Sequence, residues 1–214
     1  VPRLPSGDYS GLRRRILRLD PSPYVELTSS NEPVVIAVDS TGVSVHRAGG
    51  WVERVHGKKK RYVKIHFAVN VENGEVVAME VTTDDVHDSK VFPKLLEEAE
   101  RHGNVVKALG DGAFDSSDIY ELLDSKGIEA VIKPRRRSRL DTSSEARGRA
   151  VGLYRRLGHE GWARLKGYGR RWIVETVYST FKRVFGEHCM AKTLGNIAKE
   201  LVAKATIYNF LVNL

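Results

Sequence analysis

The stretch VVIAVDSTG, residues 34–42, decides the fold class. Its first five residues are apolar and mostly β-branched, which is typical of a strand that is buried on both faces of a sheet. An aspartate, Asp39, and turn-forming residues follow, so we expect the strand to end there. A second apolar run, 105–109, ends in the same way at GDG, residues 110–112. The sequence therefore predicts two buried strands with Asp39 and Asp111 at their carboxyl ends.

The segments around these two runs complete an α/β pattern. Apolar periodicity predicts strands at 34–38, 61–71, 76–81, 105–109 and 130–132, and helices at 11–19, 89–102, 116–125, 170–188 and 194–213. Three strands in a meander, followed by helix, strand, helix and strand, predict a mixed five-stranded sheet flanked by helices. This order is similar to the ribonuclease-H-like fold.

Positive charge is concentrated in one part of the chain. Lys and Arg number 35 against 27 Asp and Glu, a net charge of +8, and residues 135–171 alone hold twelve basic and three acidic residues. Such a segment suggests a polyanionic partner, with Arg135, Arg136, Arg137 and Arg139 as candidate phosphate ligands. A solvated loop is the alternative. The segment is rich in Arg and Ser at its start, and we expect it to be mobile until a polyanion neutralises it.

Several function classes are disfavoured by what the sequence does not contain. Cys189 is the single cysteine, so no intramolecular disulfide framework or cysteine-based zinc site is expected. No P-loop motif is present, and no apolar run approaches the ~18 residues of a membrane span. Composition is typical of a soluble globular protein.

The two aspartates predict a cation site. If their strands are neighbours in the sheet, Asp39 and Asp111 converge where ligands of open α/β sheets bind. Two adjacent carboxylates repel each other unless a cation lies between them, and Mg²⁺ prefers such oxygen ligands. The alternative is that both are turn residues or caps. Two further aspartates, Asp88 and Asp115, are expected to be helix N-caps.

A third acid, Glu175, lies within the helix predicted at 170–188. At about 100° per residue, three polar residues fall within about 40° of Glu175: Tyr168, Arg171 and Lys182. The neighbouring flank is apolar (Val174, Tyr178, Phe181 and Phe185) and is expected to pack in the core, as is Trp172. The alternative is a solvated face with an Arg–Glu pair four residues apart.

Together, VDSTG at 38–42, GDGAFDS at 110–116 and the spacing Tyr168-(2)-Arg171-(3)-Glu175-(6)-Lys182 resemble the DDE transposases of bacterial and archaeal insertion sequences. The resemblance covers about residues 34–190, and the signature matches without a gap. It implies a ribonuclease-H-like core at 34–134 and 171–190. It also implies that Asp39, Asp111 and Glu175 are catalytic and hold two Mg²⁺ or Mn²⁺ ions. Tyr168, Arg171 and Lys182 would bind DNA.

The resemblance also implies a reaction. Metal-dependent cleavage of double-stranded DNA at transposon ends would precede strand transfer into target DNA, by a homodimer in a synaptic complex, in the cytoplasm at the nucleoid. Residues 1–33 would be an N-terminal arm left from a DNA-binding region, 135–170 a basic insertion and 191–214 a C-terminal helix. A metal-dependent nuclease that only hydrolyses and a DNA-binding protein with an unused catalytic site are the alternatives.

Overall fold

The computed structural model describes residues 11, 14–15, 18, 30–45, 61–140 and 143–214. Of the helix predicted at 11–19, only residues 11, 14–15 and 18 are described, and they are helical; most of the N-terminal arm lies outside the described residues. Among the described helices, none is long and apolar enough to cross a membrane.

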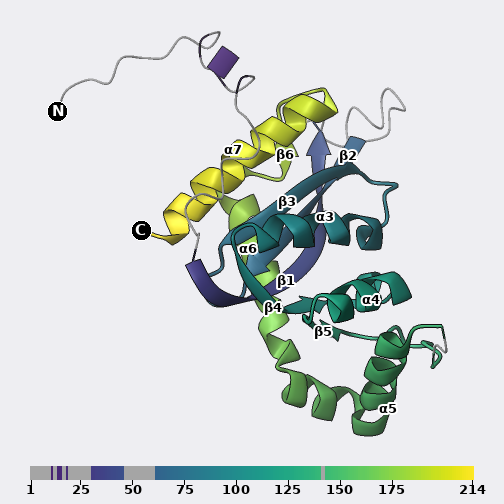
Figure 1. Cartoon of the computed structure of the whole chain (residues 1–214). Coiled ribbons are helices and arrows are strands. Elements are labelled where there is room, and N and C mark those ends of the chain that lie inside the picture. Colours follow the sequence, from purple (N-terminus) through teal and green to yellow (C-terminus); the bar gives the residue numbers. More distant parts are fainter. Residues whose placement is uncertain (1–10, 12–13, 16–17, 19–29, 46–60, 141–142) are drawn as a thin grey trace.

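A mixed sheet forms the centre of the molecule (Figure 1). Its strands are β1 (Ser30–Val45), β2 (Arg61–Asn70), β3 (Val76–Thr83), β4 (Gly103–Gly110), β5 (Glu129–Ile132) and the short β6 (His188–Cys189). The order is β3-β2-β1-β4-β5, with β2 antiparallel to both β1 and β3, while β4 runs parallel to β1 and β5 parallel to β4. The predicted mixed five-stranded α/β sheet is confirmed as ribonuclease-H-like, and β6 adds a sixth strand.

Helices cover both faces of this sheet. They are α3 (Asp88–Glu100), α4 (Ser117–Ser125), α5 (Glu145–Lys166), α6 (Trp172–Phe185) and α7 (Leu194–Val212), with 3₁₀ turns η2 (Gly112–Phe114) and η3 (Tyr168–Arg171). Side chains alternate along β1, so Ile36 and Val38 pack with α3 and α4, whereas Ala37 packs with α6 and α7. By the same alternation, Asp39 faces α6.

Strand β1 is longer than predicted and passes beyond Asp39. Pairing with β2 continues as far as Val45 opposite Arg61, which keeps β1 extended. On its other edge, β1 pairs with β4 up to Ala37 opposite Leu109 and with β6 from Ser44 onward. In the described part of the chain, the stretch 38–43 therefore has no strand neighbour on this edge, and Asp39 lies at the start of that opening.

The basic segment is folded where a mobile loop was predicted. Residues 145–166 form α5, which lies beyond β5 at the end of the molecule away from α7 (Figure 1). Buried Val151 and Trp162 anchor this helix, and Gly158, with φ 67° and ψ 174°, breaks it into two parts. Two buried apolar residues are enough to fix α5 because ion pairs from Arg147 and Arg149 also attach its first part to the rest of the domain.

Candidate functional site

Asp39 and Asp111 meet where two parallel strands diverge. Each stands two residues after the last β1–β4 pair, Ala37 opposite Leu109. The Asp39 carboxylate accepts a hydrogen bond from the Ser40 N–H at 2.8 Å, and that of Asp111 accepts one from the Ala113 N–H at 2.8 Å. Burial raises the pKa of Asp39, and the nearby charge of Asp111 raises it further, against the opposing effects of the Ser40 N–H and Arg171.

The glycines beside Asp111 leave room for other parts of this chain. A Cβ on Gly110 would lie 3.1 Å from the Phe114 ring, and a Cβ on Gly112 would lie 3.4 Å from Cγ of Arg135. Close packing of these two side chains holds the turn that carries Asp111.

Arg171 joins two of the predicted catalytic acids. One terminal nitrogen donates to Asp39 Oδ2 at 3.0 Å, and the other donates to Glu175 Oε1 at 2.5 Å. The Arg171 side chain is 17% exposed, whereas that of Glu175 is 60% exposed. Although burial lowers the pKa of Arg171, Tyr168 and these two carboxylates raise it, so the guanidinium stays charged.

Tyr168 completes the polar cluster from the other side. The Arg171 guanidinium carbon lies 5.9 Å from the centre of its ring. The ring of Trp162, on α5, lies 4.9 Å from that of Tyr168, and His159 lies 6.3 Å from it. Tyr168 thus connects the basic insertion to Arg171. It belongs to the 3₁₀ turn η3, which precedes α6, so the α-helix does not extend back to Tyr168.

Lys182 and Trp172 lie on the same helix as Glu175. The Lys182 ammonium donates to Thr41 Oγ1 at 2.8 Å, within the open stretch of β1. Trp172 is 60% exposed, so the prediction that it packs in the core is wrong. The buried side of α6 is already filled by Val174, Val177, Tyr178 and Phe181. Of the four residues predicted to pack in the core, Phe185 is only partly buried.

Tyr178 contacts the backbone of Asp39, a role that periodicity could not reveal. Its hydroxyl donates to the Asp39 carbonyl oxygen at 2.7 Å, lies 3.1 Å from the Ile65 carbonyl oxygen and accepts from the Phe67 N–H at 2.9 Å. A tyrosine in a row of core residues, three positions after Glu175, was the available signal, because a buried hydroxyl needs a partner.

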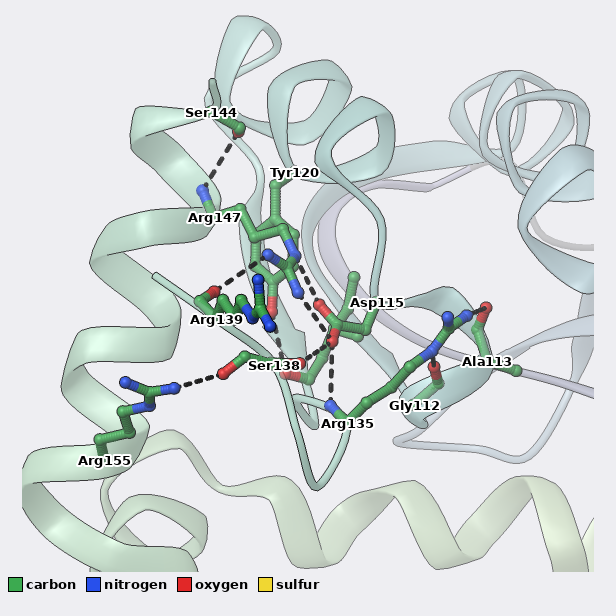
Figure 2. A network of polar contacts seen from close by, with 11 residues as sticks. Gly112, Ala113, Asp115, Tyr120, Arg135, Ser138, Arg139, Ser144, Arg147 and Arg155 are labelled. Atoms are coloured by element: carbon green, nitrogen blue, oxygen red, sulfur yellow. Dashed lines mark hydrogen bonds and ion pairs between the residues drawn. The ribbon is translucent and has the colours of Figure 1, made fainter. Parts of the chain in front are cut away.

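Neither aspartate predicted to be an N-cap has that role. Helix α3 begins at Asp88 itself, and this carboxylate pairs with Lys64 at 3.2 Å. Helix α4 is preceded by Ser116, while Asp115 binds Arg147 through two hydrogen bonds (Figure 2). Both carboxylates instead bind cationic side chains from distant segments, which are stronger hydrogen-bond donors than the backbone N–H groups at a helix N-terminus.

The arginines that open the basic segment differ in their surroundings. The Arg135 side chain donates to the carbonyl oxygens of Gly112 and Ala113, next to Asp111, at 2.8 and 3.5 Å. Arg136, Arg137 and Arg139 are exposed.

The chemistry of the three acids fits a divalent cation, because carboxylate oxygens are the ligands that Mg²⁺ prefers. Within the described residues, however, no three His, Cys, Asp or Glu side chains are grouped so that they could hold a metal ion. The guanidinium of Arg171 lies between Asp39 and Glu175 and neutralises them in this state.

The family comparison agrees with this fold. A family model described as "Transposase DDE domain" matches residues 30–210, which include every strand of the sheet and helices α3 to α6. Because the match covers most of the sequence, the chain belongs to the DDE transposase family.

Proposed function

We propose that this domain cleaves DNA at transposon ends and transfers the freed 3′-hydroxyl into target DNA, with Asp39, Asp111 and Glu175 as its catalytic carboxylates. The observation that carries the proposal is the placement of Asp39 and Asp111, each two residues beyond the last pair of the adjacent parallel strands β1 and β4, with one guanidinium joining Asp39 to Glu175. The place where the pairing of neighbouring parallel strands stops is where α/β sheets bind their ligands.

Transposases of this family depend on a divalent metal, typically Mg²⁺. Asp39 and Asp111 would hold it from the strands, and Glu175 would join them from α6. When bound, the ions would activate the attacking oxygen and stabilise the leaving oxygen during in-line displacement at phosphorus. Glu175 is well placed to change partners, because its exposed side chain is held by Arg171 alone among the hydrogen bonds of the described residues.

The cations of the site would position DNA. Arg171 would exchange its carboxylate partners for a phosphate, which a guanidinium can bind through two hydrogen bonds. Lys182 would hold a second phosphate near Thr41, and the hydroxyl of Tyr168 a third. In phosphoryl transfer such positioning accounts for much of the protein's contribution.

The remaining segments would serve the same substrate. Residues 34–134 and 171–190 would form the catalytic core, the insertion 135–170 would contact the DNA flank, and 1–33 and 191–214 would form an arm and a C-terminal helix. Two copies would hold two transposon ends in a synaptic complex.

Single-turnover assays on a labelled transposon-end duplex test this function. We expect wild-type protein with Mg²⁺ or Mn²⁺ to cut the duplex and join it to a supercoiled target. Asp39→Asn should abolish cleavage and keep DNA binding, because it removes a metal ligand and reduces repulsion of phosphates. Retained cleavage by Asp39→Asn would contradict the assignment.

The same assay separates the alternatives. Cleavage without joined product would indicate a nuclease that only hydrolyses. Metal-independent DNA binding without cleavage would indicate a DNA-binding protein with an unused site.

A further inference from the structure

Outside the catalytic cluster, the most completely buried carboxylate with charged partners is that of Asp115, four residues after Asp111. Its side chain is fully buried. Four hydrogen bonds reach its two oxygens: from Arg147 Nε at 2.8 Å, Arg147 Nη2 at 3.1 Å, the Arg135 N–H at 2.9 Å and Ser138 Oγ at 2.5 Å (Figure 2). Burial raises the pKa of Asp115, but these donors lower it more, so the carboxylate is ionised at neutral pH.

The donors come from two segments that Asp115 holds together. Arg135 and Ser138 belong to the loop after β5, residues 133–140, and Arg147 belongs to the first turn of α5. Further contacts fasten the same loop to α5, because Arg147 donates to the Arg139 carbonyl oxygen at 3.4 Å and Arg155 to that of Ser138 at 2.5 Å. Asp115 is therefore the shared acceptor through which the loop and α5 are fixed to the Asp111 turn.

This anchoring uses backbone atoms of the loop and the Ser138 hydroxyl, and it does not involve the side chains of Arg136, Arg137 and Arg139. Arg136, Arg137 and Arg139 are exposed, and no hydrogen bond or ion pair of their side chains is found among the described residues. The loop 133–140 contains no acidic residue that could neutralise them. Its backbone is nevertheless held at 135, 138 and 139, so the three guanidinium groups start from a defined surface next to the turn that carries Asp111.

A fixed surface of unpaired guanidinium groups suits a row of phosphates. Guanidinium groups bind phosphate through paired hydrogen bonds, and a surface that is ordered beforehand loses less entropy on binding than a mobile loop. We propose that Asp115 is a positioning residue for DNA: it fixes residues 135–139 beside the catalytic turn so that Arg136, Arg137 and Arg139 hold backbone phosphates of the duplex flanking the scissile bond. This inference rests on the proposed function.

A mutant cycle tests whether Asp115 acts through these arginines. The variants are Asp115→Asn, the triple variant Arg136→Ser, Arg137→Ser, Arg139→Ser, and their combination. The affinity of each for a fluorescently labelled duplex is measured against salt concentration, and thermal unfolding is recorded. The control is Asp124→Asn, which removes an exposed α4 partner of Arg149 on α5.

We expect Asp115→Asn and the triple variant each to flatten the slope of log K against log[salt] by ~0.9 for every phosphate that the protein no longer binds, about 2 to 3 in all. The combination should be no flatter than the triple variant, and Asp124→Asn should keep the wild-type slope. A folded Asp115→Asn protein with the wild-type slope, or effects that add, would overturn the proposal.

A second variant keeps the test possible if Asp115→Asn does not fold. Ser138→Ala removes one hydrogen-bond donor of the loop to Asp115 and should flatten the salt slope in the same direction. An unchanged slope for Ser138→Ala would overturn the proposal. Cleavage by the wild type is assayed in parallel. If the wild type cleaves DNA but the Asp115 and Ser138 variants keep the wild-type salt slope, this inference alone is refuted. If the variants flatten the slope but the wild type does not cleave DNA, the proposed catalytic function alone is refuted.

Discussion

The hydroxyl of Tyr178 donates to the carbonyl oxygen of Asp39 at 2.7 Å and thereby links α6 to the strand that carries the first of the proposed catalytic carboxylates. The hydroxyl oxygen also accepts from the N–H of Phe67, which lies opposite Asp39 in the β1–β2 pair. A single side chain thus links the helix of Glu175 to the backbone of Asp39.

Tyr178→Phe should separate this link from packing. The ring, stacked on Phe67 with centres 4.8 Å apart, stays in place, while buried backbone groups lose a partner. We expect a loss of ~1–3 kcal/mol in the free energy of unfolding. Cleavage should slow by about 10- to 100-fold, because displaced catalytic groups react poorly.

The control for this change is Tyr208→Phe. The Tyr208 hydroxyl donates to the Gly74 carbonyl oxygen at 3.3 Å, away from Asp39. Its removal should reduce stability and leave the rate of cleavage at saturating metal unchanged. If Tyr178→Phe cleaves DNA at the wild-type rate, the Tyr178 hydroxyl does not position Asp39 for catalysis.

Arg171→Ala should tighten metal binding by DNA-free protein while slowing cleavage. The guanidinium neutralises Asp39 and Glu175, so its removal leaves more negative potential for a divalent cation. We expect about tenfold tighter Mn²⁺ binding, or ~1.4 kcal/mol, measured by electron paramagnetic resonance.

Arg170→Ala is the matched control, because Arg170 pairs with Glu72 in the turn between β2 and β3. Its Mn²⁺ affinity should equal that of the wild type. Equal affinity in Arg171→Ala would mean that the guanidinium does not compete with the metal.

Lys182→Ala should lower single-turnover cleavage by about 10- to 100-fold, equivalent to the ~1.5–3 kcal/mol of a charge-assisted hydrogen bond. The affinity for the metal should equal that of the wild type, since an ammonium group is not a metal ligand. The stability of the fold should change little because the substitution removes one hydrogen bond, to Thr41. Arg183→Ala, an exposed cation on the next position of α6, serves as control and should cut normally. Similar rates for both variants would place Lys182 outside the DNA path.

His66 should make stability depend on pH. The side chain is fully buried; Nε2 lies 2.8 Å from Thr82 Oγ1, while Nδ1 has no hydrogen bond and lies 3.6 Å from Asp88. Burial lowers the pKa of His66, as does Lys64, against the opposing charges of Asp88 and Glu80.

As the pH falls, His66 therefore takes up a proton at a higher pH in the unfolded chain than in the folded chain. Stability is fully present above pH ~6.5 and falls as the pH drops below it, by at most ~1.4 kcal/mol per pH unit. Urea unfolding between pH 7.5 and 5.5 should show a smaller decrease for His66→Gln, whereas His102→Gln should retain the wild-type decrease. Parallel decreases in all three proteins would exclude His66 as the cause.

Local patterns were sufficient for most of the sheet and helices. Alternation at 61–71 and the apolar run at 34–38 predicted β2 and the centre of β1, because side chains of a buried strand meet apolar neighbours on a regular period. The two residues of β6 carry no such period. Trp172 could not be placed by size and hydrophobicity, since four other residues already fill the buried side of α6.

The sequence by itself determined the ribonuclease-H-like α/β class and the candidates Asp39, Asp111 and Glu175, because strand periodicity and the spacing of a helical signature are local properties. Tertiary structure decided the partners of these groups: Arg171 lies between Asp39 and Glu175, Tyr178 holds the Asp39 backbone, and Asp115 binds the basic loop where a helix cap was predicted. Each of these contacts joins residues far apart in the sequence or depends on which atoms compete for one acceptor. Spacing along the chain records neither, since a buried carboxylate or hydroxyl takes the strongest donor or acceptor that folding brings within reach.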